Sequence, residues 1–209
     1  MKNAMKALLL LAASLLPLIG MATPLAYVEG VHYKPTAQRI ATSDEKVVEV
    51  VELFSYSCPH CFHLDPSVEE WKKTLPENVK FSRVPAIFRD SWLQLARVFY
   101  AAEATGDLEK LHPLIFNAIH VEKRRLQTEE ELLDFVAEQG IERDAFEKTM
   151  NSFSVKGKVK KALVMSQTSG ITGVPSMIVN GQYIVDAPMA GGMPELLKVV
   201  DFLIQQESN

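Results

Sequence analysis

Residues 47–61 read VVEVVELFSYSCPHC, a β-branched run that passes directly into a Cys-Pro-His-Cys motif. The nearly continuous apolar character of 47–54 predicts a buried strand. Apolar residues then recur with near-helical spacing over 61–75, and Pro59 suits the first turn of a helix. A second strand is expected over 79–84. The stretch therefore predicts the order strand, CxxC motif, helix, strand.

The rest of the chain changes character twice. Helical patterns fill residues 89–169, with a first helix ended by Gly106, one interrupted at Pro113 and another opened by a capping box that starts at Thr128. Strand patterns return after residue 175, on either side of Asn180 and Gly181, which are a strong signal for a hairpin turn.

The simplest organisation is an α/β fold interrupted by an insertion. We predict one α/β domain made of residues 23–88 and 170–209, and an inserted all-helical domain over 89–169. A short edge strand is expected over 31–33, and the last helix is expected to start at Pro194.

The N-terminus has the features of an export signal. Lys2 and Lys6 precede an apolar stretch over 7–19, and small residues lead up to Ala22. This pattern predicts a secretory signal peptide over 1–22, cleaved after Ala22. A membrane anchor is the alternative, but the apolar stretch is shorter than the roughly 20 residues that a spanning helix needs. We therefore expect an exported protein in an oxidising compartment, where disulfides persist.

The composition is that of a globular protein, with 47% hydrophobic residues, 23% charged residues and a formal net charge of -4. No block of five or more basic residues occurs, so we expect no nucleic-acid partner. No second long apolar run follows the leader, which predicts a soluble mature chain.

The chain has two cysteines, Cys58 and Cys61, and four interpretations of the pair compete. Zinc needs four ligands, which the nearby histidines are badly spaced to complete, so we expect no metal. Haem attachment requires histidine directly after the second cysteine, where this chain has Phe62. A structural bridge over so short a loop would restrict the unfolded chain little. The pattern favours a redox-active dithiol that needs no other cofactor.

The position of the motif predicts unequal roles for its cysteines. Cys58 comes at the N-terminus of the expected helix, where unpaired N–H groups and the helix dipole favour a thiolate. No acid precedes Asp65 in that helix, and His60 can donate a hydrogen bond or positive charge to the sulfur. Cys61 falls on the apolar face. We expect Cys58 to be the nucleophile and Cys61 the resolving thiol, in a protein that oxidises its substrates.

The chain resembles the DsbA family of bacterial periplasmic disulfide oxidoreductases in three features taken together. These are the motif of residues 54–61 following a hydrophobic strand, the helical insertion, and Gly173, Val174 and Pro175 before a hairpin. The resemblance implies a thioredoxin-like fold with an inserted helical domain, and a monomeric dithiol oxidase in the periplasm. It also implies reduced, unfolded secreted proteins as substrates. Reoxidation would come from a quinone-linked membrane oxidase of the DsbB type.

The resemblance also implies roles for residues outside the motif. Pro175 matches the cis-proline that faces the active-site disulfide in the family, with Val174 beside it as a substrate-pairing residue. Glu52 matches an acid beneath the disulfide and is expected to accept the proton of Cys61, although a strand acid could instead point to solvent. Arg83, where the family often has lysine, is its expected partner, because a buried carboxylate needs one.

Two other kinds of function remain open at this point. A disulfide isomerase or reductase could share the fold, and a non-catalytic periplasmic binding or assembly module could use the same groove. The histidines outside the motif, His32, His63, His112 and His120, are interpreted as ordinary surface or helix residues.

Overall fold

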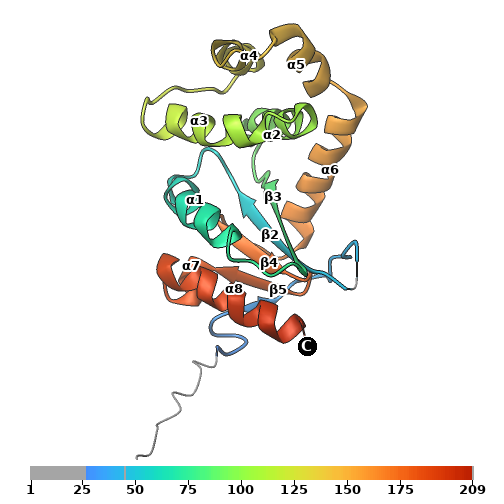
Figure 1. Ribbon diagram of the computed structural model, residues 1–209, viewed down its shortest axis with the longest axis vertical. Helices are drawn as coiled ribbons and strands as arrows, with labels where there is room; N and C mark the ends of the chain where they lie inside the picture. The colour runs from blue at the N-terminus through green and yellow to red at the C-terminus, as the bar shows by residue number, and fades with distance from the viewer. Residues whose placement is uncertain (1–26, 45, 209) are drawn as a thin grey trace, which may run out of the picture.

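The protein, described here by a computed structural model over residues 27–44 and 46–208, is built on a five-stranded mixed sheet in the order β1-β5-β4-β2-β3 (Figure 1). Strand β2 pairs in parallel with β3 and antiparallel with β4, and the hairpin β4–β5 continues antiparallel to β1. The strands are β1 (Lys34–Pro35), β2 (Val48–Phe54), β3 (Val79–Pro85), β4 (Ser176–Val179) and β5 (Tyr183–Asp186).

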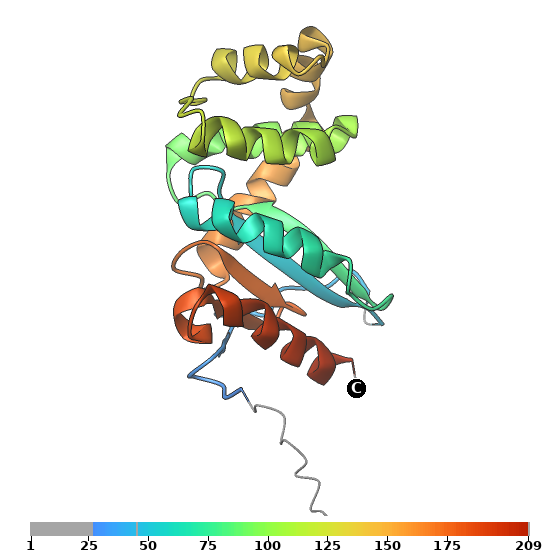
Figure 2. The ribbon, with the colours of Figure 1, turned by 60° about the vertical axis from the view of Figure 1, so that its left-hand side comes forward.

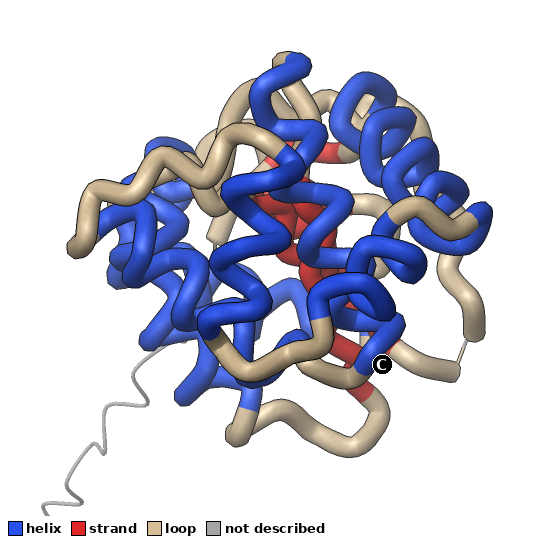
Figure 3. Tube along the Cα trace, turned by 90° about the horizontal axis from the view of Figure 1, so that it is seen from above, coloured by secondary structure: helices blue, strands red, loops and turns tan. Residues whose placement is uncertain are grey.

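Helices cover both faces of this sheet, as the view from above in Figure 3 shows. Five helices of the insertion lie between β3 and β4 in the chain; α2 to α5 form a layer beyond one end of the sheet, and α6 runs back beside the sheet (Figures 1 and 2). The helices are α1 (Pro59–Lys72), the 3-10 turn η1 (Asp90–Trp92), α2 (Leu93–Thr105), α3 (Leu108–His120), α4 (Glu129–Glu138), α5 (Arg143–Met150), α6 (Phe153–Thr168), α7 (Ala187–Ala190) and α8 (Met193–Glu207).

The central strand β2 is buried because its side chains alternate between two cores. Val50 packs with Met177 and the apolar faces of α1 and α8 on one side of the sheet. Leu53 packs with Ile178 on the other side, next to Met165 of α6. Val50 and Leu53 are fully buried, so the near-continuous apolar pattern that predicted the strand has a direct packing cause.

A third core joins the insertion to the active-site segment. It gathers apolar side chains of the insertion, among them Phe99, Leu111 and Ile115, and it also contains Phe54 and Cys61. The end of β2 and the buried cysteine of the motif therefore pack against the inserted helices rather than against the sheet core.

Several local predictions are confirmed. Asn180 and Gly181 form the turn of the β4–β5 hairpin with φ values of 49° and 64°, which is the left-handed geometry that favours these residues. Thr128 caps α4 in a reciprocal box with Glu131. Helix α2 ends at Gly106, which is left-handed, with a φ of 82°.

Other local predictions were wrong. Pro113 does not interrupt α3. Its missing N–H removes only one helical hydrogen bond, and the packing of the apolar face of the helix compensates for this loss. Residues 31 and 32 lie in a turn instead of a strand, in which the His32 N–H bonds to the Val28 carbonyl; Tyr33 forms only an isolated bridge with Glu29, and the edge strand is β1. The helix expected to reach residue 75 ends at Lys72, and α7 was not predicted.

The predicted signal peptide over 1–22 lies outside the described residues. Within residues 27–44 and 46–208, no helix is both long and apolar enough to cross a membrane. The division of the chain at residues 88/89 and 169/170 stays a prediction.

The hairpin turn yields a stability prediction. A Cβ on Gly181 would overlap the backbone carbonyl oxygen of Ile40, whose own N–H bonds to Gly181 O at 2.9 Å. We expect Gly181→Ala to lower the free energy of unfolding by about 2 kcal/mol or more, measured by urea denaturation. Gly106→Ala is the control, because it is also left-handed but a Cβ there meets nothing within 4 Å. Equal losses in the two variants would contradict the steric explanation.

Candidate active site

The Cys-Pro-His-Cys motif lies where the central strand ends and a helix begins. Cys58 is the N-cap of α1, in extended geometry with φ −95° and ψ 117°, and Pro59 is the first helical residue. The Cys58 N–H bonds to Ser55 O at 3.0 Å, and Cys58 O accepts from the Phe62 N–H at 3.1 Å. The first turn of α1 contains no acidic residue, so nothing there opposes an anion at the helix N-terminus.

The two cysteines have unequal environments. Cys58 is half-buried, and its pKa is lowered from 9.0 to about 6. The largest cause is a hydrogen bond from Cys61; burial opposes it, while the backbone N–H groups of Cys61 and His60 and the charge of His60 reinforce it. Cys61 is fully buried, and burial first, then its hydrogen bond with Cys58, raises its pKa strongly. Near neutral pH Cys58 is therefore mostly a thiolate, while Cys61 keeps its proton.

A loop from the far end of the chain approaches the Cys58 sulfur. The peptide bond between Val174 and Pro175 is cis, as the family resemblance implied, and the Cys58 sulfur lies 3.4 Å from the Val174 carbonyl oxygen, to which it donates when protonated. Strand β4 begins only at Ser176, so Val174 lies outside the strand ladder. Beside it opens a groove of about 620 Å³, lined mostly by apolar groups of 172–175 and 186–193, with His60 at its edge.

Glu52 and Arg83 form a buried ion pair. Arg83 Nε donates to Glu52 Oε2 at 2.8 Å, while Nη2 and Nη1 donate to Asp65 at 2.9 Å and Glu69 at 2.6 Å. The Glu52 side chain is 2% exposed, so it does not point to solvent. Burial raises the pKa of Glu52 although Arg83 lowers it, and the charge of Glu52 in turn adds to the raised pKa of Cys61.

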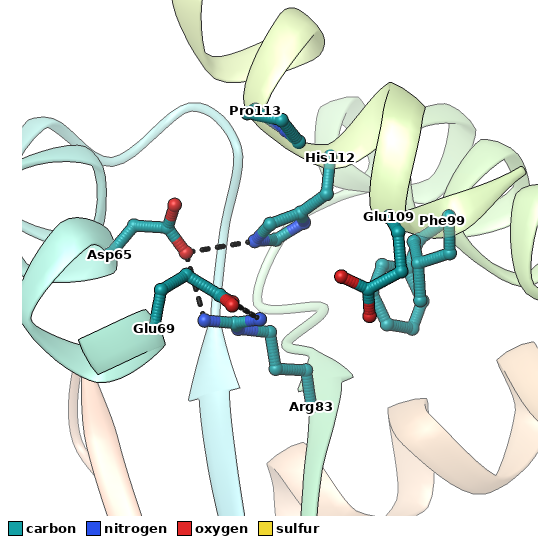
Figure 4. A pocket seen from close by; sticks show the side chains of 8 residues that line it. Asp65, Glu69, Arg83, Phe99, Glu109, His112 and Pro113 are labelled. Atoms are coloured by element: carbon teal, nitrogen blue, oxygen red, sulfur yellow. Dashed lines mark hydrogen bonds and ion pairs between the residues drawn. The ribbon is translucent and has the colours of Figure 1, made fainter. Parts of the chain in front are cut away.

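His112 belongs to this cluster, and its interpretation as an ordinary surface or helix residue was wrong. It is 4% exposed, and its Nε2 lies 3.0 Å from Asp65 Oδ1 while its Nδ1 lies 2.8 Å from the Tyr56 hydroxyl. Figure 4 shows Asp65 between His112 and Arg83. One signal could have found it, because His112 is four residues from both Leu108 and Phe116 on one stripe of α3.

His120 also contacts the active-site segment. Its ring stacks on Phe62 with centroids 4.9 Å apart, and its Nε2 lies 2.8 Å from the backbone carbonyl oxygen of Tyr56. The stretch just before Cys58 is therefore held by two histidines of α3, one at the Tyr56 hydroxyl and one at its carbonyl. Among the described residues no group of three or more His, Cys, Asp or Glu side chains could hold a metal ion.

The causes of the low Cys58 pKa can be ranked by titration. We expect the ultraviolet absorbance of the reduced protein to report a thiolate with a pKa of about 6. Cys61→Ala should raise this pKa more than His60→Ala, because the thiol hydrogen bond is the larger stabilising contribution. His63→Ala, on an exposed side chain of α1, should leave it unchanged. A larger effect of His60→Ala would overturn the ranking.

The buried cluster should be sensitive to the loss of the Arg83 guanidinium, which binds three of its carboxylates. Arg83→Met leaves Glu52 and Asp65 with buried charge and no guanidinium, so we expect the free energy of unfolding to fall by about 3–5 kcal/mol. Arg143→Met removes ion pairs from a side chain that is 37% exposed, and we expect a loss below about 1 kcal/mol. Chemical denaturation of both variants at neutral pH makes the comparison, and similar losses would contradict it.

Comparison with known proteins places this site in a family. Residues 77–198 match the DSBA-like thioredoxin domain. Thiol:disulfide interchange protein DsbA of Pseudomonas aeruginosa is 38% identical over 207 residues, covering 99% of this chain and 97% of that protein. The protein of the same name from Azotobacter vinelandii is 43% identical over 178 residues, covering 85% of this chain and 83% of that protein.

Solved structures agree with the sequence relatives. The crystal structure of Pseudomonas aeruginosa DsbA has a TM-score of 0.82 at 40% identity, covering 87% of this chain and 94% of that one. The oxidoreductase DsbA from Xylella fastidiosa has a TM-score of 0.78 at 29% identity, covering 84% of this chain and 95% of that one. The expected thioredoxin-like fold is thereby confirmed, and the chain belongs to the DsbA family of thiol:disulfide interchange proteins.

Proposed function

We propose that the protein is a dithiol oxidase that introduces disulfide bonds into reduced exported proteins through Cys58 and Cys61. The observation that carries this proposal is the contrast between the thiols, since the pKa of Cys58 is about 6 while that of buried Cys61 is strongly raised. A stabilised Cys58 thiolate is a good leaving group, which favours the reduced form of the protein and the oxidation of its substrate.

The oxidising cycle has two exchange steps. A substrate thiolate attacks the sulfur of Cys58, the bond between Cys58 and Cys61 breaks, and Cys61 leaves as a thiolate that takes a proton. A second substrate thiolate then attacks the substrate sulfur of the mixed disulfide, and Cys58 leaves as a thiolate. Two substrate thiols are oxidised to a disulfide, and the protein is left as a dithiol.

Glu52 is the group that we propose to exchange the proton of Cys61. Its raised pKa allows it to hold a proton that a typical surface carboxylate would lose, and its charge acts on Cys61 directly. Arg83 keeps Glu52 from being an unpaired buried charge when the proton is gone.

Val174 and Pro175 provide the surface on which an unfolded chain would lie. The backbone of Val174 lies outside the sheet ladder, so an extended peptide can pair with it while the substrate cysteine reaches the sulfur 3.4 Å from the Val174 carbonyl. The apolar groove beside it suits substrates that have not yet buried their apolar side chains. This favours broad recognition of unfolded proteins.

The need for a reoxidising partner follows from the chemistry of the reaction, and the cellular compartment follows from the predicted signal peptide. Each turnover consumes the disulfide, so an oxidant must restore it; we propose a quinone-linked membrane oxidase of the DsbB type. The leader over 1–22 supports export to the periplasm. No cofactor other than the disulfide between Cys58 and Cys61 takes part, and the protein acts as a monomer. A reductase is less well supported, because the low pKa of Cys58 favours its release as a leaving thiolate.

Substitution of each cysteine tests the proposed cycle. Cys58→Ser should abolish the catalysed oxidation of a reduced, unfolded ribonuclease. Cys61→Ala should instead accumulate a covalent complex between Cys58 and the substrate, seen by non-reducing gel electrophoresis and mass spectrometry. Ser57→Ala, on an exposed neighbour, is the control and should oxidise the substrate at the unsubstituted rate. Catalysis that survives Cys58→Ser would rule the proposal out.

A further inference from the structure

The hydrogen bonds of His112 run in one direction. Asp65 is held as a carboxylate: burial raises its pKa, but the hydrogen bond with His112 and the charge of Arg83 outweigh burial and lower it. A carboxylate only accepts, so His112 Nε2 must donate to Asp65 Oδ1 across 3.0 Å. Burial lowers the pKa of His112, so its ring is neutral near pH 7 and Nδ1 accepts from the Tyr56 hydroxyl. The chain of donors therefore points from Tyr56 through His112 to Asp65.

Asp65 connects this chain of donors to the ion pair at Glu52. Its Oδ1 accepts from both His112 Nε2 at 3.0 Å and Arg83 Nη2 at 2.9 Å. The guanidinium of Arg83 is a rigid plane, so the contact of Nη2 with Asp65 helps to set where Nε meets Glu52. His112 is thus three contacts away from Glu52, through Asp65 and Arg83, although it belongs to the inserted helical segment.

Packing alone does not require a histidine at this position. The rings of Phe54, Phe99 and Phe116 surround His112 with centroids 5.0–6.2 Å away, an environment that a phenylalanine would suit. An imidazole there must satisfy both nitrogens by hydrogen bonds, as it does. The charged groups that face it are Asp65 and Glu69 of α1, Arg83 of β3 and Glu109 of its own helix, which line a shared cavity of about 140 Å³ (Figure 4).

We propose that His112 is a positioning residue for proton exchange between Glu52 and Cys61, acting through Asp65 and Arg83. The inference rests on the proposed function and adds to it a residue supplied by the insertion. The inserted helices thereby take part in the chemistry of the dithiol as well as in packing.

The step in question is the resolution of a mixed disulfide when the reduced protein is oxidised. With glutathione bound to Cys58 through sulfur, the Cys61 thiol gives its proton to the Glu52 carboxylate and its sulfur attacks the Cys58 sulfur. The bond between Cys58 and Cys61 forms, the bond to glutathione breaks, and glutathione leaves as a thiolate. The protein dithiol is oxidised, and the disulfide of oxidised glutathione is reduced.

The experiment follows this step separately from the first attack. Reduced protein is mixed with oxidised glutathione between acid and alkaline pH, the reaction is quenched with acid, and mass spectrometry resolves dithiol, mixed disulfide and disulfide. The rate at which the mixed disulfide forms measures the reactivity of Cys58. The rate at which it is converted to the protein disulfide measures the attack by Cys61 and the proton transfer to Glu52. The reference is Tyr56→Phe, which keeps the bond between His112 and Asp65 and leaves no unpaired hydroxyl when His112 is also changed.

We expect the double variant Y56F/H112F to form the mixed disulfide at the rate of Y56F but to resolve it severalfold more slowly at pH 7, with an altered pH profile. This loss is smaller than the roughly hundredfold that removal of an acid–base group itself causes. His112→Gln keeps an N–H donor toward Asp65, so it should resolve the mixed disulfide faster than Y56F/H112F does. If His112 served only to fill space, glutamine would have no advantage over phenylalanine.

Resolution in Y56F/H112F with the rate and pH profile of Y56F would overturn the proposal. If that variant does not fold, Asp65→Asn decides: slowed resolution supports the proposal, and resolution as in the unsubstituted protein overturns it. The proposed function is tested apart from this, because an unsubstituted protein that fails to oxidise reduced ribonuclease would refute the oxidase while the glutathione reaction still reports on His112.

Discussion

The structure depends on one placement, the Cys58 sulfur at the point where the central strand becomes a helix. Strand β2 is buried on both faces, so its end is fixed, and α1 starts there with a proline and without an acid in its first turn. The N–H groups of that turn and the hydrogen bond from Cys61 stabilise a thiolate. A sulfur anion held in this way makes the disulfide easy to break and the dithiol favourable, which is the basis of an oxidase.

The inserted helices complete the site from the opposite side. Cys61 packs in their core, and α3 holds the segment before the motif through His112 and His120. The same helix reaches the carboxylates around Arg83, so the sheet and the insertion meet in a charged cluster beneath the dithiol. Such a cluster is stable only when every charge has a partner, and this makes the relative position of the two parts matter for the chemistry.

Local signals in the sequence were reliable where one residue sets the backbone. Gly181 and Gly106 adopt the left-handed conformation that their turns require, and Thr128 caps its helix as its spacing with Glu131 predicts. Sequence patterns were less reliable for helix breaks and edge strands, because these depend on contacts with residues far along the chain. Pro113 suggested a break that the packing of α3 overrides, and the edge strand formed after residue 33 because its partner is the distant strand β5.

By itself the sequence determined the reactive pair and its place at a helix start, since these depend on residues within a few positions of one another. It indicated the family through that motif together with the distant Val174 and Pro175. The family resemblance offered Arg83 as the partner of Glu52, but only the tertiary structure shows their contact and decided that His112 joins them through Asp65. The reason is physical: a buried polar side chain is stable only with a hydrogen-bonding or charged partner, and the partners here come from α1, β3 and α3, which are far apart in the sequence. The contact of His112 with Asp65 in particular exists only once the insertion packs against α1.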